Sequence, residues 1–403
     1  MMERVGKYIT SYIKGKTPKV LLPDEEVNTM PYLSPDYLRG VAAPEFYAKQ
    51  DNKSIVVDNG EVIVLWDGSN AGEILISKKG VLASTMTMLQ FDEKQIDKAY
   101  FGYSFQNLEY ILKAKTAGSG IPHADKGVIS KLEFYKPSLT EQSAIAAILS
   151  RVDEAIASVQ TSISAAERLK KSLMQNLLTG RMKPDGTLRK EDEFYVVEKF
   201  GKVPKGWEVK RIDEIADFVQ YGLNQASSET GIIPMFRMNN IVNSEMQNYP
   251  LVYVNLNDTA LCQYKLEKGD ILFNRTNSMD LVGKVGVFKL EGDYVFASYL
   301  IRIRVSKDNN PYFVNYTLNS YPIQCSLRSR ATPAVSQANI NSKSLRGTSI
   351  LIPKEKQEQD EIVSRIEQVE LGINNKQQKI AILERLKKSL MQNLLTGRVR
   401  VNV

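Results

Sequence analysis

The feature that most constrains how this chain can fold is a block of fifteen residues that occurs twice. Residues 167–181 and residues 384–398 both read Glu-Arg-Leu-Lys-Lys-Ser-Leu-Met-Gln-Asn-Leu-Leu-Thr-Gly-Arg, 217 positions apart. An identical run of this length does not arise by chance. The chain therefore contains one architectural unit written twice, and both copies must be placed before any other element is interpreted.

The apolar residues before each block extend the repeat as a pattern. They recur at alternating steps of four and three positions, after Glu141-Gln142 in the first copy and after Glu358-Gln359 in the second. The first series is Ile145, Leu149, Val152, Ile156, Val159, Ile163 and Ala166; the second is Ile362, Ile366, Val369, Ile373, Ile380 and Leu383, interrupted by Lys376. This period is typical of a coiled-coil seam. We expect the apolar face to continue through Leu169, Leu173, Leu177, Leu386, Leu390 and Leu394.

Each series predicts a helix of roughly 38 residues, on the order of 57 Å long at ~1.5 Å per residue. Gly180 and Gly397 follow the apolar series and should end the helices, because glycine adopts the left-handed cap conformation at low cost. An apolar stripe of this length must be buried on a partner. The simplest partner is the other copy, in an antiparallel pair that relates the two halves by an approximate two-fold axis. The alternatives are that each helix packs on its own domain or on another subunit.

Length and composition describe the rest of the chain only broadly. The 403 residues are enough for two domains of ~150 residues. No apolar run approaches the ~20 residues that span a bilayer, and the first residues lack a signal-peptide core. Cys262 and Cys325 are too few for a disulfide framework and are not spaced as metal ligands, so we expect a cytoplasmic protein. The net charge of +7 and the pI near 9.0 favour a polyanionic partner.

The two segments that precede the helices share an order of elements. In the first, a turn at 67–72 between alternating residues at 61–66 and 73–77 predicts a hairpin, with further strands at 54–58 and 81–89, a helix at 101–115 and a loop at 117–123. In the second, residues 206–211 open the segment, 232–237 is a strand candidate, 269–275 leads into a loop at 276–284, and 285–288 and 294–298 continue the sheet. A helix is expected at 310–320 and a loop at 330–337, before 350–353. Residues 60–66 align with 269–275, residues 83–84 with 297–298, and His123 with Gln337.

These patterns predict an α+β protein with two globular mixed α/β domains, two long antiparallel helices that form a coiled coil, and a pseudo-two-fold internal repeat. We place the first domain at 1–138 and the first helix region at 139–182. The second domain, with its leading linker, falls at 183–352, and the second helix and tail at 353–403. The helices are nearly identical while the domains match only in pattern, so the scaffold is common and the working surfaces differ.

Residue patterns for catalysis are weak. Asn309-Asn-Pro-Tyr312 is one proline short of the tetrad of DNA adenine methyltransferases and follows no glycine-rich turn, so a helix cap near Pro311 is the better interpretation. Pro184-Asp185 with Glu208-Val-Lys210 is a common pattern that is too short to indicate a nuclease. There is no glycine-rich phosphate loop, and His123 is the only histidine. The sequence predicts no catalytic residue, no bound metal and no enzyme.

Several motifs, in this order, resemble the specificity subunit of type I restriction-modification enzymes. They are Gly269-Asp-Ile-Leu-Phe-Asn-Arg-Thr276, Val282-Gly-Lys284, Phe296-Ala-Ser298, Gln337-Ala-Asn-Ile-Asn341, Pro353, Glu358-Gln359 before a long helix, and the terminal Leu-Leu-Thr-Gly. The resemblance covers nearly the whole chain. One departure is that Pro204-Lys-Gly-Trp207 opens the second domain in family style, whereas residues 1–13 hold no counterpart.

The resemblance implies a non-catalytic subunit that binds double-stranded DNA. Each globular domain would act as a target-recognition domain for one half of a split, asymmetric target. The helices would set the spacing of the half-sites and dock two methyltransferase subunits, which assemble with restriction/translocase subunits. We expect the methyl donor, ATP and Mg²⁺ on those partners only, no cofactor on this chain, and no membrane association.

DNA recognition needs cationic and small polar groups for phosphates, and Arg, Asn, Gln or Lys side chains on rigid loops for base edges. The candidates in the first domain are Trp66, Asp67, Ser69, Asn70, Lys78, Lys79 and His123. Those in the second are Arg237, Asn239, Asn240, Arg275, Thr276, Asn277, Lys284, Arg330 and Gln337. Each has a simpler interpretation, as a solvated turn or as a side chain that completes its own local turn.

The identical helix blocks hold candidates for partner docking. They are Lys170, Lys171, Gln175, Asn176, Lys387, Lys388, Gln392 and Asn393. Alternatively, the lysines form the solvated face of a helix and interact with its dipole, or they bind DNA. Identity of the two copies favours a duplicated docking surface for two identical subunits. Two other functions fit the sequence less well. The missing donor-binding and catalytic motifs argue against a free-standing methyltransferase or nuclease with a fused recognition module, and a purely structural coiled-coil adaptor does not explain two diverged, polar-looped domains on duplicate scaffolds.

Overall fold

The computed structural model describes residues 1–49, 51, 54–115, 122–333 and 337–402. The chain divides into two compact units. Unit 1 comprises Met1–Ser162 and Lys376–Val403, and unit 2 comprises Ile163–Asn375. This division cuts each long helix near its middle, whereas the sequence patterns placed each whole helix in a segment of its own. The predicted loops at 117–123 and 330–337 lie partly outside the described residues.

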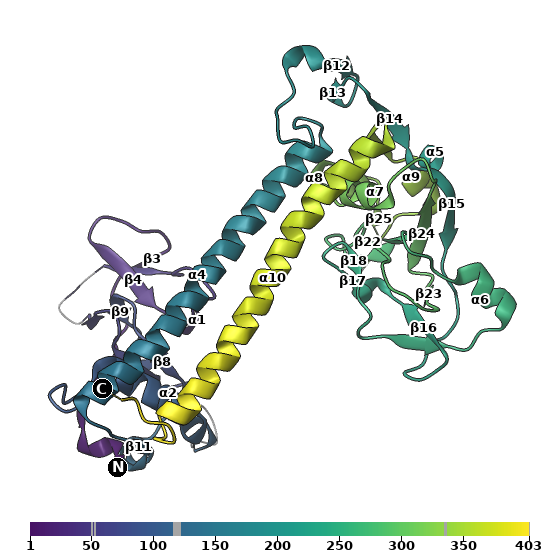
Figure 1. Ribbon diagram of the computed structural model, residues 1–403. Coiled ribbons are helices and arrows are strands. Elements are labelled where there is room, and N and C mark those ends of the chain that lie inside the picture. Colours follow the sequence, from purple (N-terminus) through teal and green to yellow (C-terminus); the bar gives the residue numbers. More distant parts are fainter. Residues whose placement is uncertain (50, 52–53, 116–121, 334–336, 403) are drawn as a thin grey trace. The chain divides into compact units, whose positions relative to one another are not determined.

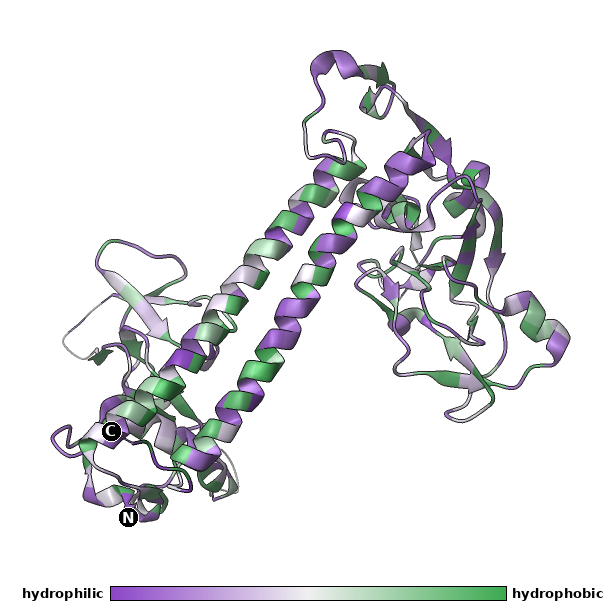
Figure 2. Cartoon of the chain, viewed as in Figure 1, coloured by the Kyte–Doolittle hydropathy of each residue, from purple (hydrophilic) through white to green (hydrophobic). Residues whose placement is uncertain are grey.

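Two long helices, α4 (Leu139–Leu178) and α10 (Lys356–Leu394), span 40 and 39 residues, close to the predicted length (Figure 1). Hydrophobic and hydrophilic residues alternate along both, as expected of amphipathic helices (Figure 2). Both end in the same way. Gly180 and Gly397 have φ angles of 67° and 71°, and the amides of Met182 and Val399 donate to the carbonyls of Asn176 and Asn393. The predicted left-handed glycine caps are confirmed.

The two helices are antiparallel, and an ion pair within each unit shows it. In unit 1, Lys387 near the end of α10 lies 2.7 Å from Asp153 in the first half of α4. In unit 2, Lys170 near the end of α4 lies 2.7 Å from Glu370 in the first half of α10. The predicted antiparallel arrangement is therefore confirmed.

Burial along the predicted seam is uneven. Ile145, Leu149 and Ile362 are fully buried because the first turns of each helix also pack into the core of the globular part that precedes it. Leu169 and Leu386 were expected on the apolar face, but they are 52% and 46% exposed. The reason is the residue that follows each of them: Lys170 and Lys387 turn toward the other helix, and neighbouring helix positions are about 100° apart.

Within its described residues, the globular part of unit 1 contains three sheets and three helices. Strands β2 (Ile9–Lys14), β10 (Met86–Phe91), β7 (Val62–Leu65) and β8 (Ile74–Ile76) form one sheet, in that order. Strands β3 (Leu21–Leu22), β5 (Tyr47–Lys49), β4 (Thr29–Leu33), β9 (Gly80–Leu82) and β6 (Val56–Val57) form the second, and β1 (Met2–Arg4) pairs with β11 (Glu133–Tyr135). The helices are α1 (Pro35–Arg39), α2 (Lys98–Ala114) and α3 (Lys126–Lys131), with a 3-10 turn at Val5–Lys7.

The structure confirms the predicted hairpin as β7 and β8, and the predicted helix at 101–115 as α2. Two strand predictions need correction. The strand expected over 81–89 is two strands of different sheets, because the amide of Met86 closes a turn onto the carbonyl of Ala83. The strand at 54–58 pairs with β9 and is not part of the hairpin sheet.

Unit 2 has a larger sheet that corresponds to the first sheet of unit 1. Its order is β15 (Ala216–Tyr221), β24 (Leu300–Val305), β20 (Ile271–Asn274), β22 (Val285–Val287), β18 (Glu245–Met246) and β17 (Ile241–Val242). Further sheets are β19 (Val252–Val254), β16 (Ile233–Phe236) and β23 (Val295–Phe296); β21 (Thr276–Asn277), β26 (Ala338–Asn339) and β25 (Thr332–Pro333); β12 (Phe194–Val197) with β13 (Gly201–Pro204); and β14 (Trp207–Arg211) with β27 (Ser349–Pro353). The helices are α5 (Ile212–Ile215), α6 (Asp258–Tyr264), α7 (Pro311–Leu318), α8 (Tyr321–Ser329) and α9 (Ser342–Arg346), with 3-10 turns at Glu191–Glu193 and Met238–Asn240.

A fully buried glutamine fixes the start of each long helix. Gln142 accepts from the amide of Asp97 at 2.9 Å and donates to the carbonyl of Pro137 at 3.0 Å. Gln359 accepts from the amide of Asn310 at 2.8 Å and donates to the carbonyl of Pro353 at 2.9 Å. Asp97 and Asn310 are themselves the N-caps of α2 and α7. Each glutamine therefore joins a long helix to the capped end of a domain helix, and the two units are built on one plan.

The glutamate before each glutamine binds the segment that follows the other long helix. In unit 1, Glu141 accepts from Arg400 Nε at 2.8 Å and Nη2 at 2.7 Å. In unit 2, Glu358 accepts from Arg189 and, at 3.0 Å, from the indole nitrogen of Trp207. We call these two arrangements the glutamate clasps. They close each unit around the beginning of one helix and the end of the other.

Candidate nucleic-acid interface

Backbone hydrogen bonds show which residues of unit 1 and unit 2 are equivalent at the ends of β7 and β20. The amide of Trp66, directly after β7, donates to the carbonyl of Thr85 at 2.7 Å, and the amide of Arg275, directly after β20, donates to the carbonyl of Tyr299 at 3.1 Å. The predicted alignment of Trp66 with Arg275 agrees with this pattern. Trp66 and Arg275 therefore follow equivalent strands, at the corresponding end of the corresponding sheet in each unit.

The residue of unit 2 that corresponds to His123 is not the predicted one. The amide of Ala124 donates to the carbonyl of Trp66, and the amide of Ile340 donates to the carbonyl of Arg275, both at 2.9 Å. His123 and Asn339, the residues before these two amides, are thus equivalent, and the alignment of His123 with Gln337 was wrong. The sequence misled because this equivalence is set by hydrogen bonds to Trp66 and Arg275, which are distant in the sequence.

A glycine on the neighbouring strand identifies a further pair of equivalent positions. A Cβ on Gly15 would lie 2.1 Å from the carbonyl oxygen of Ala83, and a Cβ on Gly222 would lie 2.3 Å from that of Ala297. Neither position can carry a side chain without moving the backbone. The residues before these glycines, Lys14 at the end of β2 and Tyr221 at the end of β15, therefore also correspond.

We call these four positions the strand-end cluster. In unit 1 the cluster is Lys14, Trp66, Asp67 and His123, and in unit 2 it is Tyr221, Arg275, Thr276 and Asn339. Lys14, Tyr221 and Asn339 were not among the predicted site residues. The signal that could have found two of them is the Lys-Gly and Tyr-Gly pair at 14–15 and 221–222, each after an alternating strand.

Asp67 holds the cluster of unit 1 together. One carboxylate oxygen lies 2.6 Å from His123 Nδ1, and the other lies 3.0 Å from Lys14 Nζ. Partial burial opposes ionisation of Asp67, but the hydrogen bonds from His123 and Lys14 outweigh it and lower the pKa of this carboxyl. The side chains of Lys14 and His123 are each 56% exposed. Trp66 packs edge-on against Tyr12 beneath them.

The cluster of unit 2 has the same positions but a different chemistry. Asn339 Nδ2 donates to Thr276 Oγ1 at 3.0 Å, and Asn339 Oδ1 accepts from Arg275 Nη2 at 3.4 Å. The Arg275 guanidinium lies 5.0 Å from the centre of the Tyr221 ring. Within the described residues, Arg275 Nε is buried and has no hydrogen-bond partner. Amide and hydroxyl groups thus replace the carboxylate and imidazole of unit 1.

The other predicted residues of unit 1 lie in two places. Ser69 and Asn70 are exposed in the turn between β7 and β8, beside the cluster. Lys78 donates to the carbonyl of Tyr37 at 2.7 Å and covers its ring, so this lysine stabilises the domain. Lys79 is exposed and lies 4.0 Å from Asp58.

The predicted residues of unit 2 also separate into groups. Asn277 lies in β21 and pairs with Ala338 of β26, and Gln337 is the exposed residue directly before β26. Lys284 is exposed directly before β22, at the end of the loop that follows β21. Arg330 caps α8 and donates to the carbonyl of Gly347 at 3.2 Å, which indicates a structural role.

Three predicted residues of unit 2 lie after β16. Asn239 is exposed, and Arg237 is half-buried. Asn240 is fully buried; its amide group binds the carbonyls of Gln247 and Pro250 and the amide of Arg237. Asn240 therefore offers no free polar atom to a ligand, and we leave it out of the interface.

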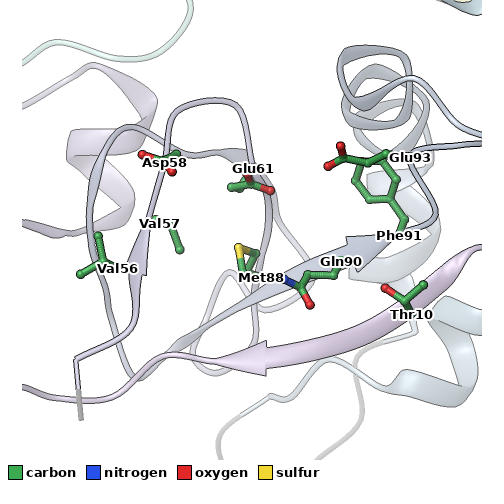
Figure 3. Close-up of a pocket in the computed structure, with 9 residues that line it drawn as sticks. All are labelled: Thr10, Val56, Val57, Asp58, Glu61, Met88, Gln90, Phe91 and Glu93. Atoms are coloured by element: carbon green, nitrogen blue, oxygen red, sulfur yellow. The ribbon is translucent and has the colours of Figure 1, made fainter. Parts of the chain in front are cut away.

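A pocket of unit 1 lies at the opposite end of the β2–β10–β7 sheet from the cluster. Its lining includes the carboxylates of Asp58, Glu61 and Glu93, with Thr10 and Gln90 (Figure 3). Three carboxylates would repel the phosphates of DNA. The charge distribution therefore favours the strand-end cluster, and not this pocket, as the nucleic-acid surface.

The predicted docking residues of the helix blocks fall into two classes. Lys170 and Lys387 face the other helix in the ion pairs described above, which gives these two lysines a structural role. Asn176 and Asn393 are half-buried and donate to the carbonyls of Ser172 and Ser389, each at 3.0 Å. Lys171, Gln175, Lys388 and Gln392 are exposed.

Among the described residues, no group of three or more His, Cys, Asp or Glu residues is placed to hold a metal ion. Within the same residues, no helix is long and apolar enough to cross a membrane.

Comparison with known proteins agrees with the two-fold plan. The family model for the type I restriction modification DNA specificity domain matches twice, at residues 5–168 and 204–385. The chain belongs to this family. The matching model describes a DNA specificity domain and not a catalytic domain, in agreement with the non-catalytic role predicted from the sequence.

Specificity subunits of known enzymes match over nearly their whole length. The chain is 32% identical to the MjaVIII specificity subunit of Methanocaldococcus jannaschii, over 99% of this chain and 92% of that protein. It is 23% identical to the EcoKI specificity subunit of Escherichia coli K12, over 96% of this chain and 87% of that protein. The fold is that of the crystal structure of the S subunit from M. genitalium, with a TM-score of 0.58 at 14% identity, over 98% of this chain and 96% of that one.

Proposed function

We propose that each unit of this specificity subunit reads one half of a split DNA target through its strand-end cluster and the loops beside it. The observation that carries the proposal is that the two clusters occupy equivalent positions but differ in every residue. A duplicated scaffold with different polar groups at one place is suited to two different half-sites. If the units bound the same sequence, there would be no reason for the clusters to differ.

The surroundings of the clusters support contact with a polyanion. Lys16 and Lys19 are exposed after β2, and Lys126 covers the ring of Tyr12 at 4.9 Å. In unit 2, Lys284 is exposed between β21 and β22. These lysines would contact phosphates, which position the protein without reading sequence, while the cluster residues would contact base edges.

The exposed part of the helix blocks would dock two methyltransferase subunits. Lys171, Gln175 and Leu169 are exposed on α4, and Lys388, Gln392 and Leu386 are their exposed counterparts on α10. Each patch thus offers one apolar side chain and several hydrogen-bonding groups to a partner. Because the two patches have the same sequence, each would bind the same kind of subunit.

The helices would also set the spacing of the half-sites. A helix of 40 residues is about 60 Å long, and a DNA turn of ~10.5 base pairs spans ~34–36 Å. Helix length would then bound the half-site separation at less than two turns. The methyl donor, ATP and Mg²⁺ would be bound by the methyltransferase and restriction/translocase partners and not by this chain.

DNA methylation by the chain, alone and with its methyltransferase subunit, tests the proposal on a genomic library. The modified sites are mapped by sequencing. We expect methylation only with the partner, at one split motif with a fixed gap. Methylation at one uninterrupted motif would show that the units do not read separate halves, and methylation by the chain alone would show an active site in this chain.

An exchange of residues 1–138 for those of another specificity subunit sharpens the test. The exchange should change one half of the motif and leave the other half and the gap unchanged. A change in both halves would contradict the modular interpretation.

A further inference from the structure

We infer that Asp67 is a positioning residue that fixes the proton of His123, and that Lys14 and His123 select a base with an exocyclic amino group in the half-site bound by unit 1. This inference rests on the proposed recognition of DNA by the strand-end cluster. It concerns only unit 1, because unit 2 has neither a carboxylate nor an imidazole at these positions.

The hydrogen bond to Asp67 determines which nitrogen of His123 carries the proton. An ionised carboxylate can only accept, and one oxygen of Asp67 lies 2.6 Å from His123 Nδ1. Nδ1 must therefore carry the proton. In the neutral imidazole the other nitrogen, Nε2, is then an acceptor. The ring is 56% exposed, so this acceptor can reach a ligand.

Lys14 supplies the complementary donors. Its ammonium group has three N–H bonds, and one of them is directed to the second oxygen of Asp67 at 3.0 Å. The side chain is 56% exposed, so the remaining donors are available on the same face. One carboxylate thus orients a donor and an acceptor, and both are held at the end of a sheet rather than on a free loop.

This pair matches only part of the major-groove code. An acceptor on the protein suits the amino group of adenine or cytosine and opposes the keto oxygen of guanine or thymine. The ammonium group suits the N7 atom of a purine. The Nε2 acceptor therefore discriminates between the two classes of base, and Lys14 contributes binding to the same or a neighbouring base.

A phosphate is a poor ligand for this arrangement. The acceptor nitrogen of His123 and the carboxylate of Asp67 would both face the negative oxygens. Exposed lysines without an acidic neighbour in hydrogen-bond contact, such as Lys16 and Lys19, are better placed for phosphates. The composition of the cluster thus favours a base edge over the DNA backbone.

The substitution Asp67→Asn tests the inference, because it should reverse the tautomer of His123. Lys14 needs an acceptor, so the amide oxygen of the new side chain should face Lys14 and its NH₂ group should face His123 Nδ1. Nδ1 then accepts, and Nε2 carries the proton and becomes a donor. The preferred base should change from adenine or cytosine to guanine or thymine at one position of one half-site.

The measurement is the methylated motif of the assembled complex with its methyltransferase subunit, for the wild-type chain and the variant. We expect relative methylation at that one position to change on the order of ten-fold. The other half-site should not change, and it serves as an internal control for folding and assembly. Lys94→Met, an exposed lysine beyond the opposite end of the sheet, should leave the whole motif unchanged.

His123→Ala decides the result if Asp67→Asn abolishes methylation. Loss of discrimination at a single position supports the inference. An unchanged motif with either variant overturns it, and so does weaker methylation at all sequences alike, which would indicate a phosphate contact. If the wild-type complex itself has no split motif, the proposed function fails and the inference fails with it.

Discussion

The two glutamate clasps solve one problem with different residues. In unit 2, Glu358 binds Arg189 and the indole of the fully buried Trp207, and Arg189 lies over the Trp207 ring. In unit 1, the bidentate Arg400 and the amide of Val401 occupy both oxygens of Glu141, and Arg400 lies 6.0 Å from the Tyr135 ring. A carboxylate that is removed from water needs full pairing. The comparison shows that this requirement is retained while the partners change.

The strand-end clusters differ in a more consequential way. In unit 1 a carboxylate orients an ammonium group and an imidazole, and in unit 2 a hydroxyl and an amide lie beside a guanidinium group. Both clusters are half-exposed, so their differences are not compensated by buried neighbours. Differences in the clasps preserve a fold, whereas differences in the clusters change what the surface can bind.

The largest expected loss of stability comes from truncating a buried aromatic side chain, and it should be confined to the unit that carries the substitution. Trp207→Ala removes a fully buried indole and should lower the stability of unit 2 by about 3–5 kcal/mol. Hydrogen exchange followed by mass spectrometry should show faster exchange in β14 and β27 and little change in β2 and β10. The mirrored variant Tyr135→Ala, in unit 1, should give the reverse pattern. Equal loss of protection in both units would mean that the cores do not unfold separately.

The helix caps should respond alike in both units. Gly180→Ala and Gly397→Ala force a side chain into the left-handed region, at a cost of about 1–2 kcal/mol. A further penalty comes from contact with Pro204 at 2.3 Å and with the Tyr135 ring at 2.7 Å. Thermal unfolding measures the loss of stability in each of the two variants.

A third glycine provides the control for the caps. Gly372 lies within α10, and no atom outside the helix backbone lies within 4 Å of an added Cβ. Gly372→Ala should raise the stability by up to about 1 kcal/mol. A loss of stability in this control would show that the penalty is not specific to the left-handed positions.

The helices and their glycine caps could be predicted because they depend on neighbours in the sequence. The orientation of Leu169 could not, because it follows from the pairing of Lys170 with Glu370, a residue 200 positions away. His123 was matched with the wrong residue for a related reason: its position is fixed by the hydrogen bond of the next residue, Ala124, to Trp66, which is distant in the sequence. Lys14 was missed because the Lys-Gly pair that marks it becomes informative only when the close approaches of Gly15 to Ala83 and of Gly222 to Ala297 are compared.

The pH dependence of stability should distinguish the clasp of unit 1. The hydrogen bonds from Arg400 outweigh the effect of burial and lower the pKa of Glu141 from its ordinary value of 4.5. A carboxyl group whose pKa is lower in the folded state stabilises the fold at pH values above its pKa in the unfolded state. This stabilisation is lost as the pH falls through the pKa of the folded state. Glu141→Gln should therefore be less stable than the wild type by about 1 kcal/mol above pH ~5.

The difference in stability between the wild type and Glu141→Gln should shrink as the pH falls below the ordinary pKa of glutamate, and it should vanish in stronger acid. Chemical unfolding at a series of pH values, observed in unit 1 by hydrogen exchange, measures it. A difference that stayed constant down to low pH would mean that the charge of Glu141 does not contribute to the clasp.

The smallest expected effect concerns adjacent lysines of the helix blocks. Lys170→Met and Lys387→Met each remove a half-buried ion pair between the helices and should lower stability by about 0.5 kcal/mol. Lys171→Met and Lys388→Met remove exposed charges and should leave stability unchanged. For affinity toward the methyltransferase subunit, measured by titration calorimetry, we expect the opposite order, because only the exposed pair is available to a partner. If the half-buried pair affected binding more than the exposed pair, the docking surface would lie on another face of the helices.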